Sequence, residues 1–312
     1  MSLLIAFSGQ GSQHKSMFKL LNADDFGKAW LKEASTIINI DLFDEAIVEK
    51  YCSDVIEVQT LIVLLSVGAF YAINRQYQLE PAFLCGYSLG EISAFAVSAH
   101  LELTEICALV RKRAVLMQEA ANNTSHHKAS GLAVLKGKIN LAEIKRLTDT
   151  HDCHIAIINA ADHYIVGGLQ TNLETLLIEA KAKAVMKAEC LAVKLPSHTP
   201  LLRQATVNFA AYLQAFQSYS LHYPILNALN QELIFNTSDM LTILAKELSQ
   251  TLHWDRVMAI ALEYGISSFL ELGPRAALKN MILAKKPGLR AYNLEAFSSL
   301  NGLVEKKLKL SM

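Results

Sequence analysis

The sequence predicts an α/β fold built on a parallel sheet, with a small subdomain inserted into a larger domain. Apolar runs of strand length occur at 3–7 and 83–85, and a helical pattern fills most of 25–67 between them. Strands that alternate with helices in this way are typical of doubly wound parallel sheets. Because a further strand-like run follows at 268–272, we expect both ends of the chain to build one large hydrolase-like domain.

The middle of the chain follows a different pattern. A polar, turn-rich segment at 121–131 indicates a boundary. Beyond it, strand, helix, strand, strand, helix and strand patterns follow in that order, at 132–135, 141–147, 155–158, 164–166, 173–184 and 190–195. This order is typical of a ferredoxin-like α+β unit. We therefore expect a large domain of residues 1–123 and 196–312 and a ferredoxin-like subdomain of residues 124–195.

The composition narrows the class of protein. Lys plus Arg equals Asp plus Glu at 29 each, which gives no basic stripe and argues against a nucleic-acid partner. The longest apolar stretch, 61–73, is too short for a membrane span and predicts a buried helix. The five cysteines stand singly, without the spacing of a zinc site or a disulfide framework. We expect a cytoplasmic protein without a metal.

The motif Gly86-Tyr87-Ser88-Leu89-Gly90 is the strongest functional signal. It joins the strand-like run 83–85 to a helical pattern of apolar residues, which predicts an amphipathic helix. A Gly-x-Ser-x-Gly turn between a strand and a helix is typical of a nucleophile elbow, in which a strained serine exposes its hydroxyl. The motif predicts acyl transfer or acyl hydrolysis by Ser88, with the amide of Leu89 as one oxyanion donor.

Three further residues could complete such a site. His198 follows a strand-like run and Pro196-Ser197, so it should lie at the edge of the sheet where catalytic groups gather; alternatively, it is a turn histidine without a task. The Gly9-Gln10-Gly11 loop could supply the second oxyanion amide from Gln10, or be a plain tight turn. Arg113, on a helical pattern, could bind an acyl group that ends in a carboxylate, or be a solvated charge.

Taken together, the motifs follow the order and spacing of one family. They are 7–13, 86–91, Arg113, Asn159, 196–198 and 270–274. The chain resembles the malonyl-CoA:acyl carrier protein transacylases and the acyltransferase domains of polyketide synthases. The resemblance covers essentially the whole chain. Some features are more similar to the epsilon-type transacylase subunit of malonate decarboxylase.

The resemblance implies a role for each catalytic residue. Ser88 would carry the acyl group, His198 would be its general base and later its general acid, and Arg113 would bind the malonyl carboxylate. Gln10 and Leu89 would give the oxyanion amides. The family uses a Ser-His dyad without a required aspartate, and it orients the imidazole by a backbone carbonyl.

The resemblance also assigns residues around the pocket. The orienting carbonyl would belong to His253, where the family usually has glutamine before tryptophan. Asn159 would lie near the mouth of the site, on the small subdomain. Tyr87 would border the acyl pocket at a position where the family commonly has histidine, and His163 lies near the position of a pocket glutamine.

The reaction implied is malonyl transfer from malonyl-CoA, through an ester on Ser88, to the phosphopantetheine thiol of an acyl carrier protein. The carrier could serve fatty-acid synthesis, polyketide synthesis or malonate decarboxylation. No bound cofactor is implied, and a monomer is expected.

Two alternatives stay open. An acyl hydrolase of the α/β class would place its residues in the order Ser, Asp, His, which Asp162 could satisfy together with Ser88 and His198. A catalytically degenerate subunit that only docks the carrier protein is the other alternative.

Overall fold

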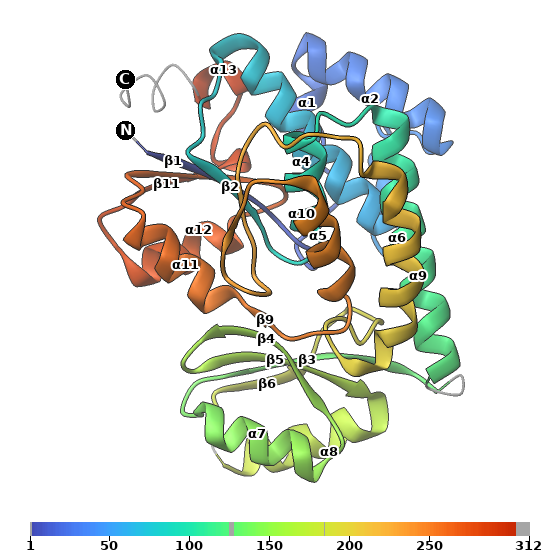
Figure 1. Ribbon diagram of the computed structural model, residues 1–312, viewed down its shortest axis with the longest axis vertical. Coiled ribbons are helices and arrows are strands. Elements are labelled where there is room, and N and C mark those ends of the chain that lie inside the picture. Colours follow the sequence, from blue (N-terminus) through green and yellow to red (C-terminus); the bar gives the residue numbers. More distant parts are fainter. Residues whose placement is uncertain (1, 125–127, 184, 304–312) are drawn as a thin grey trace.

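The computed structural model describes residues 2–124, 128–183 and 185–303. It has two sheets, one in a large domain and one in a small subdomain (Figure 1). In the view of Figure 1 the small subdomain lies at the lower end of the molecule, with α7 and α8 on its outer face. Residues 125–127, within the expected boundary segment, lie outside the described residues.

The large sheet has six strands in the order β11-β10-β1-β2-β7-β8. All neighbours are parallel except β7 and β8, which pair antiparallel at the edge. The strands are β1 (Leu3–Phe7), β2 (Phe83–Gly86), β7 (Ile225–Leu226), β8 (Leu233–Ile234), β10 (Ser268–Leu272) and β11 (Arg290–Asn293). This confirms the predicted parallel sheet that both ends of the chain build.

Alternate residues of β1 enter two different cores, as expected of a strand that is covered on both faces. Ile5 and Phe7 pack into one apolar cluster, and Leu4 and Ala6 pack into another. The helices of the large domain are α1 (Lys19–Asn22), α2 (Asp25–Ile38), α3 (Glu45–Tyr51), α4 (Glu57–Tyr77), α5 (Leu89–Ser98), α6 (Leu103–Thr124), α9 (Arg203–Leu213), α10 (Thr237–Lys246), α11 (Trp254–Glu263), α12 (Ala277–Lys285) and α13 (Leu300–Leu303). Short 3-10 turns follow at η1 (Pro200–Leu202), η2 (Gln214–Phe216) and η3 (Leu294–Ala296).

Helix α4 contains the apolar stretch 61–73 and is a core helix. It is long and apolar enough to cross a membrane, but 83% of its most apolar 18-residue window is buried inside the protein. Its side chains join the large apolar cluster together with those of α5 and α6. The predicted buried helix is confirmed, and it extends beyond the predicted limits at both ends.

Helix α5, which the elbow opens, is not amphipathic as predicted. All ten of its residues, Leu89 to Ser98, are buried. The helix lies against β2 and β1 on one side and against α4 and α10 on others, so no face of it reaches solvent. The apolar spacing seen in the sequence therefore marks only part of a surface that is buried all round.

The small subdomain has the strand order β6-β3-β5-β4, which matches the predicted ferredoxin-like arrangement. Its elements are β3 (Ser130–Lys136), α7 (Leu141–Thr150), β4 (His154–Ala160), β5 (His163–Leu169), α8 (Gln170–Ala182) and β6 (Lys187–Cys190). A fifth strand, β9 (Leu252–His253), pairs parallel to β4, although it comes from the part of the chain expected in the large domain.

The prediction of a strand at 190–195 is wrong for most of that range. β6 ends at Cys190, and one more ladder bond follows, from the amide of Leu191 to the carbonyl of Leu132. Its partner β3 begins at Ser130, so little strand remains for later residues to pair with. Residues 191–195 instead run as a crossing segment from the small subdomain to the large domain.

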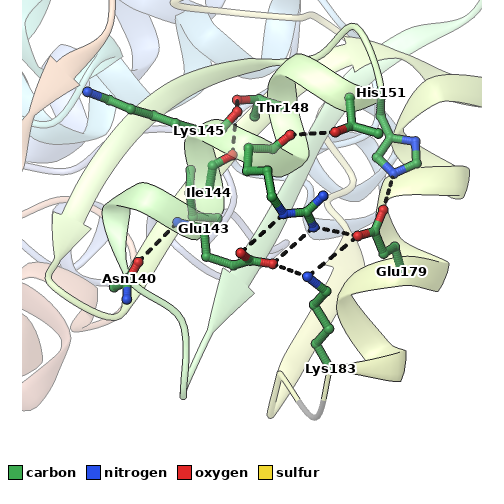
Figure 2. A network of polar contacts seen from close by, with 10 residues as sticks. Asn140, Glu143, Ile144, Lys145, Thr148, His151, Glu179 and Lys183 are labelled. Carbon is green, nitrogen blue, oxygen red and sulfur yellow. Dashed lines mark hydrogen bonds and ion pairs between the residues drawn. The ribbon is translucent and has the colours of Figure 1, made fainter.

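Helices α7 and α8 are joined on their outer face by a network of charged side chains (Figure 2). Arg146 pairs with both Glu143 and Glu179, and Lys183 pairs with the same two carboxylates. His151 Nε2 lies 2.8 Å from Glu179. Each acid of this exposed network therefore has at least two basic partners.

Candidate active site

Ser88 lies in a strained turn between β2 and α5. Its backbone has φ +54° and ψ −111°, a conformation that non-glycine residues rarely adopt. The elbow is so tight that a Cβ on Gly86 would lie 2.0 Å from the carbonyl carbon of Gly90. Glycine is therefore required there, and the geometry is that of a nucleophile elbow.

His198 contacts the hydroxyl of Ser88, as predicted, although the strand expected just before it is absent. Its Nε2 lies 2.6 Å from Ser88 Oγ. The turn that carries His198 has φ +61°, and its amide donates to the carbonyl of Leu248 at 2.8 Å. The two side chains form a nucleophile–base pair at direct hydrogen-bonding distance.

The carbonyl that orients His198 belongs to Glu247, not to His253. His198 Nδ1 lies 2.5 Å from the Glu247 carbonyl oxygen. His253 is in β9, where its amide donates to Ala228. Since a carbonyl can only accept, Nδ1 carries the proton and Nε2 is free to accept from Ser88.

Burial keeps His198 in its neutral form. The side chain is 1% exposed, and desolvation, helped by the charge of Arg113, lowers its pKa to about 3 despite the opposing effect of the Glu247 carbonyl. The alternative Ser-Asp-His triad does not form, because Nδ1 already binds a backbone carbonyl and Asp162 is an exposed residue. The structure therefore contains a dyad.

The Gly9-Gln10 loop packs directly on the elbow. A Cβ on Gly9 would lie 2.5 Å from the carbonyl oxygen of Tyr87, so only glycine permits this approach. Ser8 fixes the loop, because its hydroxyl donates to the buried Glu271 at 2.9 Å. Among the described residues, no hydrogen-bond acceptor faces the amides of Gln10 and Leu89. Neither amide donates a hydrogen bond to the described part of the protein.

Arg113 is buried, not solvated. It lies on α6, is 2% exposed, and its Nη1 donates to Gln59 Oε1 at 2.6 Å. Its Nε and Nη2 have no acceptor within the described part of the chain. These two donors form one side of the guanidinium fork, which matches a carboxylate.

Two buried carboxyl groups, Glu91 and Glu247, accompany Arg113. Both are 0% exposed, and Glu91 accepts from the amide of Ala228 at 2.8 Å. Burial raises the pKa of Glu91 to about 7 and holds that of Glu247 well above its ordinary value, against the opposing charge of Arg113. The two carboxyls are close enough to influence each other, so the pair retains a proton near neutral pH.

A polar chain connects the elbow to the small subdomain. The hydroxyl of Tyr87 donates to Asn159 Oδ1 at 3.1 Å, and Asn159 Nδ2 lies 3.4 Å from His163 Nε2. Tyr87 also packs edge-on against Trp254, with ring centroids 5.2 Å apart. These three sequence-predicted residues thus meet, whereas the described contacts of His253 are made by its backbone, to Ala228 and to β4.

Sequence reasoning missed Gln59, Glu91 and Glu247. Glu91 directly follows the elbow glycine, so its place beside the nucleophile could have been inferred from the motif. Gln59 and Glu247 stand in segments without any functional motif, and only the fold brings them to Arg113 and His198. Within residues 2–124, 128–183 and 185–303, no three His, Cys, Asp or Glu side chains are grouped as metal ligands.

A strained serine, a neutral histidine held by a carbonyl, and free amides beside them define a serine-dependent acyl-transferring enzyme of the α/β class. Residues 5–285 match the acyl transferase domain family, and the chain belongs to that family.

Individual relatives are similar over nearly the whole length of this chain. The malonyl CoA-acyl carrier protein transacylase of Bacillus subtilis is 25% identical over 309 residues, which cover 96% of this chain and 76% of that protein. The corresponding transacylase structure from Coxiella burnetii has a TM-score of 0.89 at 24% identity, and covers 100% of this chain and 98% of its own. A malonyl-transacylase in complex with a type II polyketide synthase acyl carrier protein has a TM-score of 0.88 at 23% identity, and covers 96% and 98%.

Proposed function

We propose that this protein transfers a malonyl group from malonyl-CoA to the phosphopantetheine thiol of an acyl carrier protein, through an ester on Ser88. The observation that carries this proposal is the buried Arg113, whose Nε and Nη2 have no protein acceptor beside a Ser-His pair. A buried cation with free donors favours an acyl group that ends in a carboxylate. The relatives named as malonyl transacylases support the same acyl group.

In the first half of the cycle, His198 Nε2 takes the proton of Ser88 as Oγ attacks the thioester carbonyl. The amides of Gln10 and Leu89 stabilise the oxyanion. When the carbon–sulfur bond breaks, His198 returns the proton to the CoA thiolate. A malonyl ester of Ser88 remains, with its carboxylate at Arg113.

In the second half, the phosphopantetheine thiol replaces CoA. His198 takes the thiol proton as sulfur attacks the ester carbonyl, and gives it to Ser88 Oγ when the ester bond breaks. Because Nδ1 stays bound to the Glu247 carbonyl, the imidazole can accept and donate through Nε2 alone.

Transfer and hydrolysis are separated by a partition experiment. The malonyl-enzyme is formed with labelled malonyl-CoA and then offered holo acyl carrier protein. We expect most label on the carrier protein. Release of mainly free malonate would instead identify an acyl hydrolase, and absence of any labelled enzyme would favour a degenerate docking subunit.

Three finer features belong to this proposal. We propose that Tyr87, Asn159 and His163 border the acyl pocket where the small subdomain, residues 124–195, meets the large domain, residues 1–123 and 196–312. Their polar chain across the two parts supports this role. A cytoplasmic location and a monomeric state follow from the composition and the resemblance.

The pathway to which the acyl carrier protein belongs is also part of the proposal. The motifs around Gly9, His198 and Gly273 support a subunit like the epsilon-type transacylase of malonate decarboxylase, while the named relatives favour fatty-acid synthesis. Rates of transfer to carrier proteins of the two pathways would distinguish these assignments.

A further inference from the structure

A polar cavity of about 840 Å³ has Gln10 in its wall. Five segments line it: the loop of residues 10–16, residues 49–55 at the end of α3, the crossing segment 191–195, Arg275 beyond β10, and Glu295 in η3. The first two segments are tied together, because Gln13 Nε2 donates to the carbonyl of Cys52 at 3.2 Å. The wall of the cavity thus includes two segments that are tied together and the proposed oxyanion loop.

Most charges in this cavity already have partners. His14 Nε2 lies 2.6 Å from Glu295, and Lys15 lies 3.7 Å from Glu49. Asp54 Oδ1 accepts from the first amides of α4, at Ile56 and Glu57. These acids are therefore committed to groups of the protein itself.

Two exposed cations of the cavity differ from these charges because they have no acidic partner among the described residues. Lys194 and Arg275 line it, and neither forms an ion pair with any residue that the structure describes. Lys194 lies on the crossing segment and Arg275 follows the end of β10, so they reach the cavity from separate parts of the chain. The lining charges balance, with Lys15, Lys194 and Arg275 against Glu49, Asp54 and Glu295, but Lys194 and Arg275 are the two of these cations that no described acid pairs with.

Arg275 also has an unfavourable backbone. Its φ is +60°, in the left-handed region that favours glycine. A long cationic side chain at such a position, next to the Gly273-Pro274 turn and at the wall of a cavity, indicates that the side chain has a use there.

We propose that Lys194 and Arg275 bind a phosphate of the 4′-phosphopantetheine arm, which CoA and the holo carrier protein share. This inference rests on the malonyl transfer proposed above. The thiol end of the arm would reach Ser88 past Gln10, and the phosphate would stay in the polar cavity outside. A phosphate suits this place because arginine and lysine bind it by charge-assisted hydrogen bonds.

The test compares thioesters that share the malonyl-pantetheine part and differ in what its 4′ oxygen carries: nothing, a phosphate, or the nucleotide diphosphate of CoA. Malonyl-CoA, malonyl-4′-phosphopantetheine and malonyl-pantetheine are offered to the wild type, Arg275→Gly and Lys194→Gln, and kcat/KM for labelling of Ser88 is measured. Glycine suits the positive φ, so Arg275→Gly removes the charge without adding backbone strain. Each substitution should lower kcat/KM about 10-fold for both phosphate-bearing donors and leave malonyl-pantetheine unchanged.

Controls make the outcome unambiguous. Arg256→Ala removes an exposed arginine of α11 away from the cavity and should change no donor. Each ratio between donors comes from one preparation, so a loss of folded protein cancels. A loss confined to malonyl-CoA would place the contact on the nucleotide part of CoA and overturn the shared-arm assignment.

Two further outcomes separate this inference from the function beneath it. If malonyl-pantetheine labels Ser88 but neither substitution changes the ratio between donors, the phosphate site is wrong and malonyl transfer stands. If no donor labels Ser88 in the wild type, malonyl transfer itself fails, and the phosphate site fails with it.

Discussion

Charged side chains are arranged in opposite ways in the two parts of this molecule. On the small subdomain, Glu143, Arg146, Glu179 and Lys183 are each 30–44% exposed, and all are paired (Figure 2). Beside Ser88, Arg113 is 2% exposed and Glu91 and Glu247 are 0% exposed, and each retains polar atoms without a partner. The exposed charges are satisfied, and the buried ones are not.

The difference separates structural charges from functional ones. Exposed pairs contribute little to stability, because water solvates each partner nearly as well. Buried polar atoms without partners are costly, so a folded protein tolerates them mainly where a ligand or a reaction uses them. Substitutions beside Ser88 should therefore affect catalysis and acyl selectivity. Substitutions in the exposed network of the small subdomain should affect only a small part of the stability.

The largest effect is expected at His198. His198→Ala should slow acylation of Ser88 by about 10²–10⁴, because the hydroxyl loses its base. His100→Ala, at a histidine stacked on His222, is the matched control and should act like the wild type. A near-normal rate of the His198 variant in a stopped-flow assay would move the base elsewhere.

The pH profile of the wild type tests the same residue. The pKa of His198 is lowered to about 3, so the imidazole remains neutral as pH falls from 8 to 5. The rate of acylation should therefore not fall through protonation of His198 in this range. A decline with an apparent pKa near 6.5 that persists in Glu91→Gln would show that the imidazole titrates normally.

Arg113→Ala should lower malonyl transfer about 10–100-fold more than acetyl transfer, because only the malonyl group has a carboxylate for the guanidinium. Arg113→Lys should recover part of the malonyl rate, since it keeps the charge and loses the fork. Equal losses for both acyl groups would leave Arg113 as a packing residue.

Glu91→Gln should raise the preference for malonyl over acetyl by roughly 10-fold. The substitution leaves the Glu247 carbonyl that holds His198, and it removes a carboxyl that competes with malonyl for the charge of Arg113. The ratio of the two acylation rates measures the effect. A ratio equal to that of the wild type would mean that the carboxyl does not influence acyl choice.

The smallest effect is expected on the small subdomain. Arg146→Ala should lower the thermal midpoint by about 2 °C or less and leave acylation unchanged. The pKa of Glu143 is lowered to about 2 by Arg146 and Lys183, so the network stabilises the fold above the ordinary carboxyl pKa. Its contribution should be lost as pH falls towards 2. A large loss of activity in this variant would contradict the comparison.

The sequence was sufficient where function depends on a local motif. The elbow around Ser88 and the strands at 3–7, 83–85 and 268–272 could be predicted, because each is encoded within a few neighbouring residues. The Glu247 carbonyl could not, since it lies 49 residues from His198 and meets it only when the segment after α10 packs beside the turn. The burial of α5 on all sides was missed for the same reason.

Mass spectrometry of the intact protein after incubation with malonyl-CoA tests the proposed reaction most directly. We expect one added malonyl group, located on Ser88 by fragmentation and absent in Ser88→Ala. The substitution leaves Arg113 and His198 in place, so it removes only the nucleophile. A mass increase that persists in Ser88→Ala, or no increase in the wild type, would contradict an acyl-enzyme on Ser88.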